Sequence, residues 1–374
     1  MRVNHRSWGS VGPIVLAAGL SVLMACAPSG GGPTSGAKPA EPAKPAEVAK
    51  PAEPAKPAEA AKPAEPAKPA EAAKPAAKAV AEIPIKVGLI GVGSATYGYV
   101  YAAQDRGYFA KNGLKPDITD HNSGSAAQEA LASGEADIIH YFPPGAATAV
   151  NKGVKQKVIA TDQFRPSEWH IGVAAGSPIQ SVEDLNNKKV GVTAKGSTTD
   201  FFALWLAQAK NVKLEVVPIG SAALYPSVIA NQIDAGVVTP PLVFQGLDKK
   251  EVRSIFDFGK EMPPNLPSVI VASDKIISEN PEAVNRYLKS VFESVRYLKQ
   301  NADYCTSFYS KHTNQDPSIA SRVCTLVIAN YSDDGKIQNE WLDNSLSLAK
   351  FGGLTDIPPT EQFFTDKFTP VKLD

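Results

Sequence analysis

The 374-residue chain has no excess of either charge, because 38 lysines and arginines are balanced by 38 aspartates and glutamates. It therefore offers no strongly basic surface of the kind that nucleic-acid binding needs. No Ser-His-Asp order, paired acid motif or nucleotide-binding loop (GxGxxG or GxxxxGKS/T) stands out. These absences favour a protein that binds without carrying out chemistry, so we expect no enzyme and no cofactor.

The sequence also lacks the close spacing of histidines that is typical of metal sites. His121, His140 and His170 fall near the ends of expected strands, but no tight HxH or HxxxH pair occurs and the three come from different strands. Imidazole suits zinc, copper or iron, so a shared metal site is one interpretation. We expect the other interpretation, in which each histidine forms hydrogen bonds within its own loop and binds no metal.

The beginning of the chain has the pattern of an export signal. Arg2 and Arg6 precede a short apolar run, Pro13 to Ala25, which is too short to span a bilayer comfortably. Its end, LMAC at Cys26, resembles the lipobox of bacterial lipoproteins, where cleavage precedes a cysteine that is lipidated. The resemblance implies a signal peptide over residues 1–25 and a lipid anchor at Cys26. A signal cysteine that is simply discarded is the alternative.

A repetitive segment follows the cysteine. Between Lys38 and Lys74 a lysine recurs every six residues in KPAEPA and KPAEAA units, and Val48 is the only large apolar residue. This composition cannot bury enough surface to offset the entropy lost on ordering, and proline favours an extended chain. We expect residues 26–82 to form a disordered tether between anchor and domain.

Strands and helices alternate beyond residue 82. IPIKVGLI (Ile83–Ile90) is typical of a strand, a helix should run from about Thr96 to Gly107, and the alternation continues through residue 164. A second block with the same order begins at Ile171, and a long helix capped by Ser278 or Asn280 follows later. This alternation predicts parallel βαβ units, with a mostly helical C-terminal region.

One stretch of the second block, Lys188 to Phe202, leads from a strand into a helix through glycine, serine and threonine. A helix start has unpaired N–H groups and a partial positive charge, so it can hold a carboxylate, sulfonate or phosphate. The alternative is that Ser197 or Thr198 merely caps a structural helix.

Several stretches together resemble the solute-binding proteins of ABC importers, in the branch of sulfonate, taurine, nitrate and thiamine-precursor binders (SsuA/THI5-like). The stretches are RGYFAKNGL (106–114), LASGEADI (131–138), SVEDLNNKKVGV with GST (181–198), ANQIDAGVVTPP (230–241) and VASDKIISENPEAV from Val271. They cover nearly all of residues 83–351 in the family's order. Asn187 and Asn231 stand where the family usually has glycine, and asparagine tolerates the left-handed backbone nearly as well.

The resemblance implies an α/β periplasmic-binding-protein type 2 fold with two lobes, each a mainly parallel sheet flanked by helices, joined by two hinge crossovers. Residues 83–169 would begin lobe 1, residues 170–267 would form lobe 2, and residues 268–374 would return and pack mainly on lobe 1. The hinges would lie near His170 and Ser268. The partners implied are a small molecule, an ABC permease with its ATPase, and the membrane that holds the lipid anchor on the extracytoplasmic face. A monomer is the simpler design.

Ligands of open α/β sheets lie at the carboxyl ends of strands, so candidate contacts follow from those ends. They are Ser94, Thr96, Tyr97, Asn122, Ser123, Tyr141, Phe142, Trp169, Lys195, Gly196, Ser197, Thr198, Thr199, Ser221 and Thr239. For each one alone, loop capping is the alternative. Trp169 and His170 fall at the first crossover, where an aromatic ring either covers the ligand or packs against the lobes.

The ligand class follows from the same residues. Aromatic side chains around the expected cleft favour a ligand with a flat or apolar part. No arginine is firmly placed at a strand end, and Arg165 is the nearest. We therefore expect an organic anion, such as a sulfonate or aromatic carboxylate, or a pyrimidine-like heterocycle. Lys195 is the candidate charge partner.

Two cysteines remain, Cys305 and Cys324, in the helical C-terminal region. In an exported protein they can pair as a disulfide between helices, and a free buried pair is the alternative.

Two other functions stay open. One is an enzyme on the same fold, like the related pyrimidine synthases, although these carry a cysteine-rich run that is missing here. The other is a surface sensor or adhesin.

Overall fold

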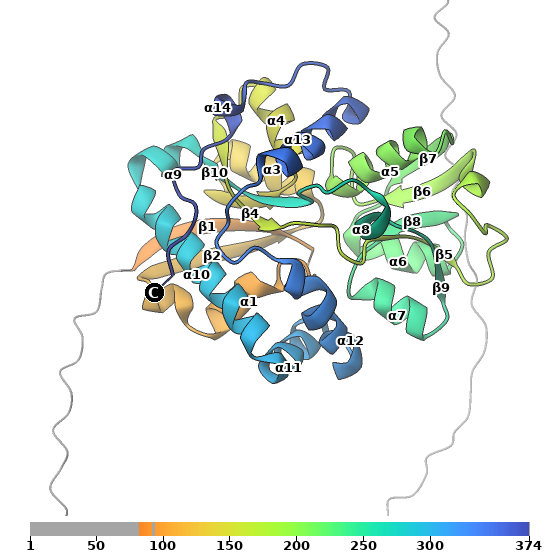
Figure 1. Cartoon of the computed structure of the whole chain (residues 1–374), viewed down its shortest axis with the longest axis horizontal. Coiled ribbons are helices and arrows are strands. Elements are labelled where there is room, and N and C mark those ends of the chain that lie inside the picture. Colours follow the sequence, from red (N-terminus) through yellow and green to blue (C-terminus); the bar gives the residue numbers. More distant parts are fainter. Residues whose placement is uncertain (1–81, 92–93, 374) are drawn as a thin grey trace, which may run out of the picture. The chain divides into compact units, whose positions relative to one another are not determined.

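The computed structural model describes residues 82–91 and 94–373, which belong to one compact unit, Ala73–Asp374 (Figure 1). The predicted signal peptide, Cys26 and almost all of the predicted tether lie outside the described residues. Among the residues described, no helix combines the length and hydrophobicity needed to cross a bilayer.

The first sheet has five strands in the order β2-β1-β3-β10-β4. Their bounds are Leu114–His121 (β2), Ile83–Ile90 (β1), Ile138–Tyr141 (β3), Ser268–Ser273 (β10) and Gln156–Gln163 (β4). β1 runs parallel to both β2 and β3, whereas β10 runs antiparallel to β3 and β4. Four strands thus share one direction, and the exception is the strand that returns from the other sheet.

Helices cover both faces of the first sheet (Figure 1). They are α1 (Gly98–Asp105), α2 (Tyr108–Lys111), α3 (Gly124–Ser133), α4 (Pro143–Asn151), α9 (Asp274–Glu279), α10 (Pro281–Gln300), α11 (Ala302–Thr313), α12 (Pro317–Arg322), α13 (Asn339–Ser347) and α14 (Thr360–Phe363). α1 packs on α10 on one face, and α13 packs on α4 on the other. This arrangement places the C-terminal helices on the first sheet.

The second sheet repeats the order of the first as β7-β6-β8-β5-β9. Its strands are Leu214–Pro218 (β7), Lys188–Val192 (β6), Ala235–Val238 (β8), His170–Ala174 (β5) and Val252–Asp257 (β9). Its helices are α5 (Thr198–Ala209), α6 (Ser221–Ile229), α7 (Leu242–Asp248) and α8 (Phe258–Glu261). β5, the first strand after the chain crosses over, is again the one antiparallel to its neighbours. The prediction of two mainly parallel α/β sheets is confirmed.

Local sequence signals explain where several elements begin. Asn280, and not Ser278, caps α10, because its side chain accepts the N–H of Ala283, and Pro281 occupies the first helical position. α10 buries one apolar stripe, including Tyr287 and Val291, against the first sheet's core. Of the two caps that the sequence allowed, the structure selects Asn280.

Other expectations need correction. The helix expected from Thr96 to Gly107 begins only at Gly98 and ends at Asp105, because the chain turns at Gly107, where φ is 70°. The region after residue 303 is not continuously helical: a π-helical turn at Val323–Val327 and an extended link break it. The strand β9 and the helix α7 were not expected, because charged residues separate their short apolar runs. Asn187 and Asn231 adopt positive φ values of 59° and 54°, as predicted.

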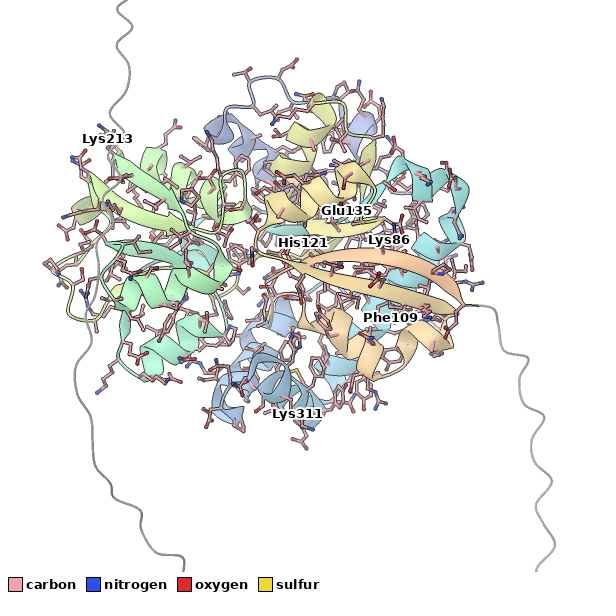
Figure 2. The ribbon with its side chains drawn as sticks, turned by 180° about the vertical axis from the view of Figure 1, so that it is seen from behind. Lys86, Phe109, His121, Glu135, Lys213 and Lys311 are labelled. Atoms are coloured by element: carbon pink, nitrogen blue, oxygen red, sulfur yellow. A yellow bond between two sulfur atoms is a disulfide. The ribbon has the colours of Figure 1, made fainter. Side chains whose placement is uncertain are left out.

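A disulfide joins Cys305 on α11 to Cys324 on the π-helical turn, with the two Cα atoms 6.1 Å apart. Figure 2 shows its yellow bond close to the labelled Lys311. The cross-link holds the turn between α11 and α12 in place, and that turn carries two residues of the cavity described next.

Candidate functional site

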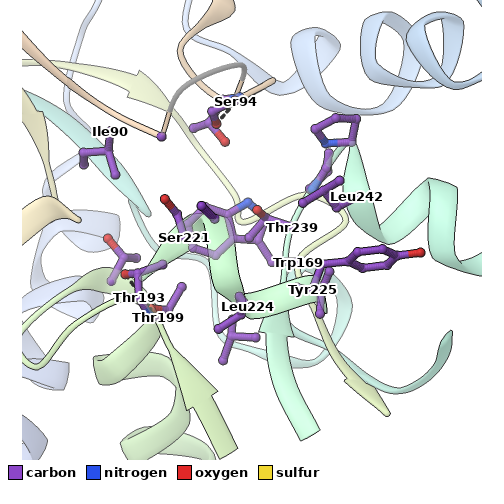
Figure 3. A pocket seen from close by; sticks show the side chains of 18 of the residues that line it. Ile90, Ser94, Trp169, Thr193, Thr199, Ser221, Leu224, Tyr225, Thr239 and Leu242 are labelled. Atoms are coloured by element: carbon purple, nitrogen blue, oxygen red, sulfur yellow. Dashed lines mark hydrogen bonds between the residues drawn. The ribbon is translucent and has the colours of Figure 1, made fainter. Parts of the chain in front are cut away.

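A cavity of about 270 Å³ is lined by residues of both sheets and the helices that follow their strands (Figure 3). It lies where strand ends meet helix starts, which is where open α/β sheets bind ligands. The predicted contacts that line it are Ser94, Thr96, Tyr97, Asn122, Trp169, Ser197, Thr198, Thr199, Ser221 and Thr239. Most of the predicted residues are therefore brought together.

The remaining predicted contacts do not line the cavity, and each has another task. Ser123 caps α3 by accepting the N–H of Ala126 at 3.2 Å. Phe142 is fully buried against Phe201 and Phe202. The strand-end rule predicts the position of a residue but not the direction of its side chain, so the structure does not bring these two residues into the cavity lining.

Tyr141 is also outside the cavity lining, and it bridges the two sheets. Its ring lies where a Cβ on Gly124 or Gly145 would come within 2.6 Å or 2.3 Å of it, so glycine at both positions leaves the space it needs. Its hydroxyl donates to the carbonyl oxygen of Gly196 at 2.7 Å. Tyr141 thus connects the end of β3 to the loop before α5.

The helix start singled out from the sequence already holds an anion of its own. Asp200 lies in the first turn of α5, and its carboxylate accepts the N–H of Gly196 at 2.7 Å. Burial raises the pKa of Asp200, against the opposing effects of the Gly196 N–H and of Lys195. Lys195 itself is exposed and does not line the cavity. The structure therefore does not place Lys195 in the cavity lining, and its contact with a ligand stays a prediction.

Three hydroxyls tie the end of β6 to the start of α5. The Oγ1 of Thr193 lies 2.9 Å from the Oγ of Ser197 and 3.0 Å from the Oγ1 of Thr199, and these last two are 2.9 Å apart. We call Thr193, Ser197 and Thr199 the hydroxyl triangle. Its members largely satisfy one another, so they form a rigid polar wall of the cavity that carries no charge.

A buried hydrogen-bond network lies behind the opposite wall. The fully buried His140 contacts Asp162 through Nδ1 at 2.7 Å, and Asp162 also accepts from Tyr99 at 2.7 Å. Ser268 donates to the same carboxylate at 3.1 Å and lies 3.3 Å from the hydroxyl of Tyr97. The network therefore runs from the carboxylate, through the strand β10, to a residue of the cavity.

The histidines have different surroundings. His140 also contacts the hydroxyl of Tyr287 through Nε2 at 2.8 Å. His170 lies 2.6 Å from Ser254 through Nδ1 and 3.3 Å from Glu168 through Nε2. Both are held by hydrogen bonds to side chains, as expected for satisfied histidines. His121 differs, because its buried Nε2 has no hydrogen-bond partner among the described residues.

Sequence reasoning missed two residues from the C-terminal region, Thr313 and Gln315, which line the cavity from the turn between α11 and α12. Asn314 between them adopts the left-handed conformation at φ 51°. The tolerance of asparagine for this conformation was the one available signal for the turn. Nothing in the sequence pattern placed that turn beside strand ends about 200 residues away.

The apolar part of the lining was missed as well. It comprises Ile90, Leu224, Tyr225, Val237, Val238, Pro240, Pro241 and Leu242, alongside the small residues Gly91, Gly124 and Ala222. Among the described residues that line the cavity, none is lysine, arginine, histidine, aspartate or glutamate. The site thus combines hydroxyls, amides and helix starts with an apolar surface.

Comparison with known proteins places the chain in a family. Residues 95–304 match the family described as NMT1/THI5 like. A Brucella abortus (strain 2308) protein, whose name makes it a candidate binding protein, is 26% identical over 304 residues, covering 77% of this chain and 92% of the relative. These findings confirm the family resemblance seen in the sequence, and the relative's name agrees with a binding protein rather than an enzyme.

Solved structures share the fold at low identity. The alkanesulfonate-binding protein SsuA from Xanthomonas axonopodis pv. citri bound to MOPS matches with a TM-score of 0.64 and 14% identity, covering 75% of this chain and 96% of that one. The desulfurization enzyme DSZB matches with a TM-score of 0.56 and 16% identity, covering 76% and 97%. With its fold and its matching segment taken together, the chain belongs to the NMT1/THI5-like family and has the periplasmic-binding-protein fold.

Proposed function

We propose that the chain is the extracytoplasmic solute-binding protein of an ABC importer, which captures a small organic molecule and delivers it to a permease. The observation that carries this proposal is the cavity of about 270 Å³ whose lining comes from both sheets. A ligand held there contacts both halves of the molecule at once. The relatives named as binding proteins support the same function.

Contacts beside the cavity suggest how binding becomes a signal. The hydrogen bond from Tyr141 to Gly196 and the contact from the N–H of Ser221 to the carbonyl of Asn122, at 3.4 Å, both join the two sheets at the cavity. A ligand can contact residues of both sheets at once only when the sheets are close together. Its contacts therefore add to these two only in the closed state. It therefore stabilises the closed state by its difference in affinity for the two states, and closure is what the permease reads.

The ligand class we propose is a small organic anion, such as a sulfonate or an aromatic carboxylate, or a pyrimidine-like heterocycle. The cavity is slightly smaller than the roughly 300–1,000 Å³ typical of sites for drug-sized ligands, which suits a metabolite. Its apolar lining suits a carbon body, and its hydroxyls and helix starts suit a polar end. That SsuA, a protein of the same fold, is an alkanesulfonate-binding protein is consistent with this class.

The proposal includes a lipid anchor at Cys26 and a tether over the following residues, on the grounds of the sequence pattern. A tethered monomer would stay close to the permease while its domain remains free to turn. Globomycin treatment, which blocks processing of lipoprotein signals, should leave the unprocessed chain in the membrane fraction. A Cys26→Ala variant that is still processed and retained at the membrane would contradict the anchor.

A ligand screen tests the function directly. Differential scanning fluorimetry and titration calorimetry of the purified chain should identify binders among sulfonates, aromatic carboxylates and pyrimidines. A ligand at a hundred times its Kd stabilises the folded state by about 2.7 kcal/mol, which is a readily measured shift in Tm.

A matched pair of variants ties binding to the cavity. Ala222→Trp fills the cavity, whereas Ala110→Trp adds the same side chain at an exposed position on α2. We expect the first variant to lose binding and solute uptake in cells, and the second to keep both. Uptake that survives Ala222→Trp, together with a screen that yields no binder, would overturn the proposed function.

An enzyme on the same fold, as the likeness to DSZB raises, finds less support. The described lining residues include no cysteine, histidine or carboxylate that could act as nucleophile or general base. Substrate turnover by the purified chain would be the observation in its favour.

A further inference from the structure

One residue that lines the cavity carries a buried hydrogen-bond donor without a partner. The Nε1 of Trp169 is buried and makes no hydrogen bond among the described residues, although the side chain is only 7% exposed. Of the described side chains with a buried unpartnered atom, Trp169 is the only one that lines the cavity. Indole N–H can only donate, and a buried donor without an acceptor is costly. The donor therefore calls for an acceptor that the chain itself does not provide.

The position of this donor is well defined. The backbone N–H of Trp169 donates to Pro166 at 3.1 Å, and its carbonyl accepts from Phe258 at 2.9 Å. Its ring packs on Phe202 with the ring centroids 5.6 Å apart. Figure 3 shows the Trp169 side chain among the lining residues, in the part of the view that also holds Ser221, Thr239 and Leu224. Trp169 is thus held at the crossover between the sheets before any ligand arrives.

A helix start with no compensating charge lies on the same cavity. α6 begins after Gly220 with no side-chain cap and no acidic residue in its first turn, and both Ser221 and Ala222 line the cavity. α5 differs, because Ser197 caps it and Asp200 supplies a negative charge. At α6 the N–H of Ser221 contacts the carbonyl of Asn122 at 3.4 Å, but no side chain caps the helix start or offsets its partial positive charge, as Ser197 and Asp200 do at α5.

We propose that Trp169 selects the ligand: its Nε1–H donates to a ligand oxygen that lies at the start of α6, and the ligand bears at most one negative charge. The apolar body of the ligand packs against Leu224, Val238 and Leu242. This inference rests on the proposed function and narrows its ligand class.

The limit on charge follows from the lining. A charged group that leaves water needs an opposite charge or several hydrogen-bond donors, and the described lining residues provide donors but no charged side chain. A single charge spread over carboxylate or sulfonate oxygens can be met by the α6 amides and the indole N–H. A second negative charge has no such partner, and a cation would meet the positive end of α6.

The test uses four probes that share one benzene ring: benzenesulfonate, benzamide, 1,3-benzenedisulfonate and benzylammonium. Calorimetry with the purified full chain should show binding of the first two and much weaker binding of the disulfonate and the cation. In ¹⁵N–¹H spectra of the wild-type chain, benzenesulfonate should move the indole resonance of Trp169 downfield. The indole resonances of Trp205 and Trp341, which do not line the cavity, should stay in place.

A conservative variant separates the donor from the ring. Trp169→Phe keeps an aromatic ring at the crossover and removes the N–H, so we expect its affinity for benzenesulfonate to fall by on the order of tenfold or more. Trp205→Phe is the matched control, because Trp205 packs on Phe256 outside the cavity, and its affinity should not change. The indole resonance of the wild type gives the same answer even where the variant folds poorly.

Each other outcome overturns the inference. It fails if Trp169→Phe binds benzenesulfonate as well as wild type, if the indole resonance is unmoved on binding, or if the disulfonate or the cation binds more tightly than benzenesulfonate. A wild-type chain that binds none of the four probes also overturns the proposed ligand class. The proposed function is decided separately, by uptake with the Ala222→Trp variant.

Discussion

The two walls of the cavity are built on sheets of the same strand order, yet what lies behind them differs. The first-sheet wall, with Tyr97, is backed by the buried carboxylate and imidazole of Asp162 and His140. The second-sheet wall is backed by the uncharged hydroxyl triangle. The strand order therefore determines where the cavity lies. The buried polar groups behind each wall determine how much free energy of unfolding is lost when that wall is mutated.

The largest expected effect is on the first wall. Asp162→Ala leaves His140, Tyr99 and Ser268 without their shared acceptor in a fully buried place, so we expect a loss of about 3–5 kcal/mol in the free energy of unfolding. Thr199→Val in the hydroxyl triangle removes neutral hydrogen bonds only and should cost about 1 kcal/mol. Urea unfolding of both variants makes the comparison. Equal losses would show that the two walls do not differ in this way.

The next largest effect is expected from the disulfide between Cys305 and Cys324, which lies among the C-terminal helices that pack on the first sheet. Replacing Cys305 and Cys324 together by serine opens a cross-link between residues 19 apart, and should lower the free energy of unfolding by about 3 kcal/mol. Because the cross-link holds the turn that carries Thr313 and Gln315, the affinity for any cavity ligand should fall as well. Thermal unfolding and calorimetry measure the two effects. An unchanged affinity would show that the turn keeps its place without the bond.

The bond that joins the two walls should have a smaller effect. Tyr141→Phe keeps the ring between Gly124 and Gly145 but removes the hydroxyl that donates to Gly196, at a cost of about 1 kcal/mol. If the Tyr141 hydroxyl meets the Gly196 carbonyl only in the closed state, the loss of this hydrogen bond should lower the ligand affinity by about fivefold. Calorimetry measures this affinity. Tyr108→Phe, on α2 and outside the cavity, is the control. Equal affinities for the two variants would mean that the bond does not distinguish the closed state.

The smallest effect lies at the crossover and depends on pH. The hydrogen bond from His170 holds the pKa of Glu168 below its ordinary value of 4.5. A carboxyl whose pKa is lower in the folded state stabilises the protein above its unfolded pKa, and this stabilisation is lost as pH falls through the folded value. Glu168→Gln should therefore destabilise the chain by about 1 kcal/mol or less at pH 7, and not at all well below pH 4.5. Thermal unfolding at a series of pH values measures the difference between variant and wild type. A difference that does not change with pH would exclude the charge of Glu168 as its origin.

Particular residues show how far the sequence reached into the site. Asn122 and Thr239 follow strands directly and Tyr97 follows β1 after a loop, and the rule that ligands lie at strand ends brought them to the cavity. Phe142 and Lys195 also follow strands, but one side chain turns into the core and the other into solvent. Position along the chain gives the end of a strand, whereas the direction of a side chain depends on what packs around it.

By itself, the sequence determined the alternation of strands and helices, the start of α10 to within two residues, at Ser278 or Asn280, and the left-handed turn at Asn187. These features arise from periodicity, capping and backbone preference, which act between residues close in the chain. Only the tertiary structure decided that Gln315 joins the cavity and that Trp169 has no partner for its N–H. Both depend on contacts between segments far apart in sequence, because packing across the two sheets fixes which side chains face the cavity and which polar atoms are left unpaired.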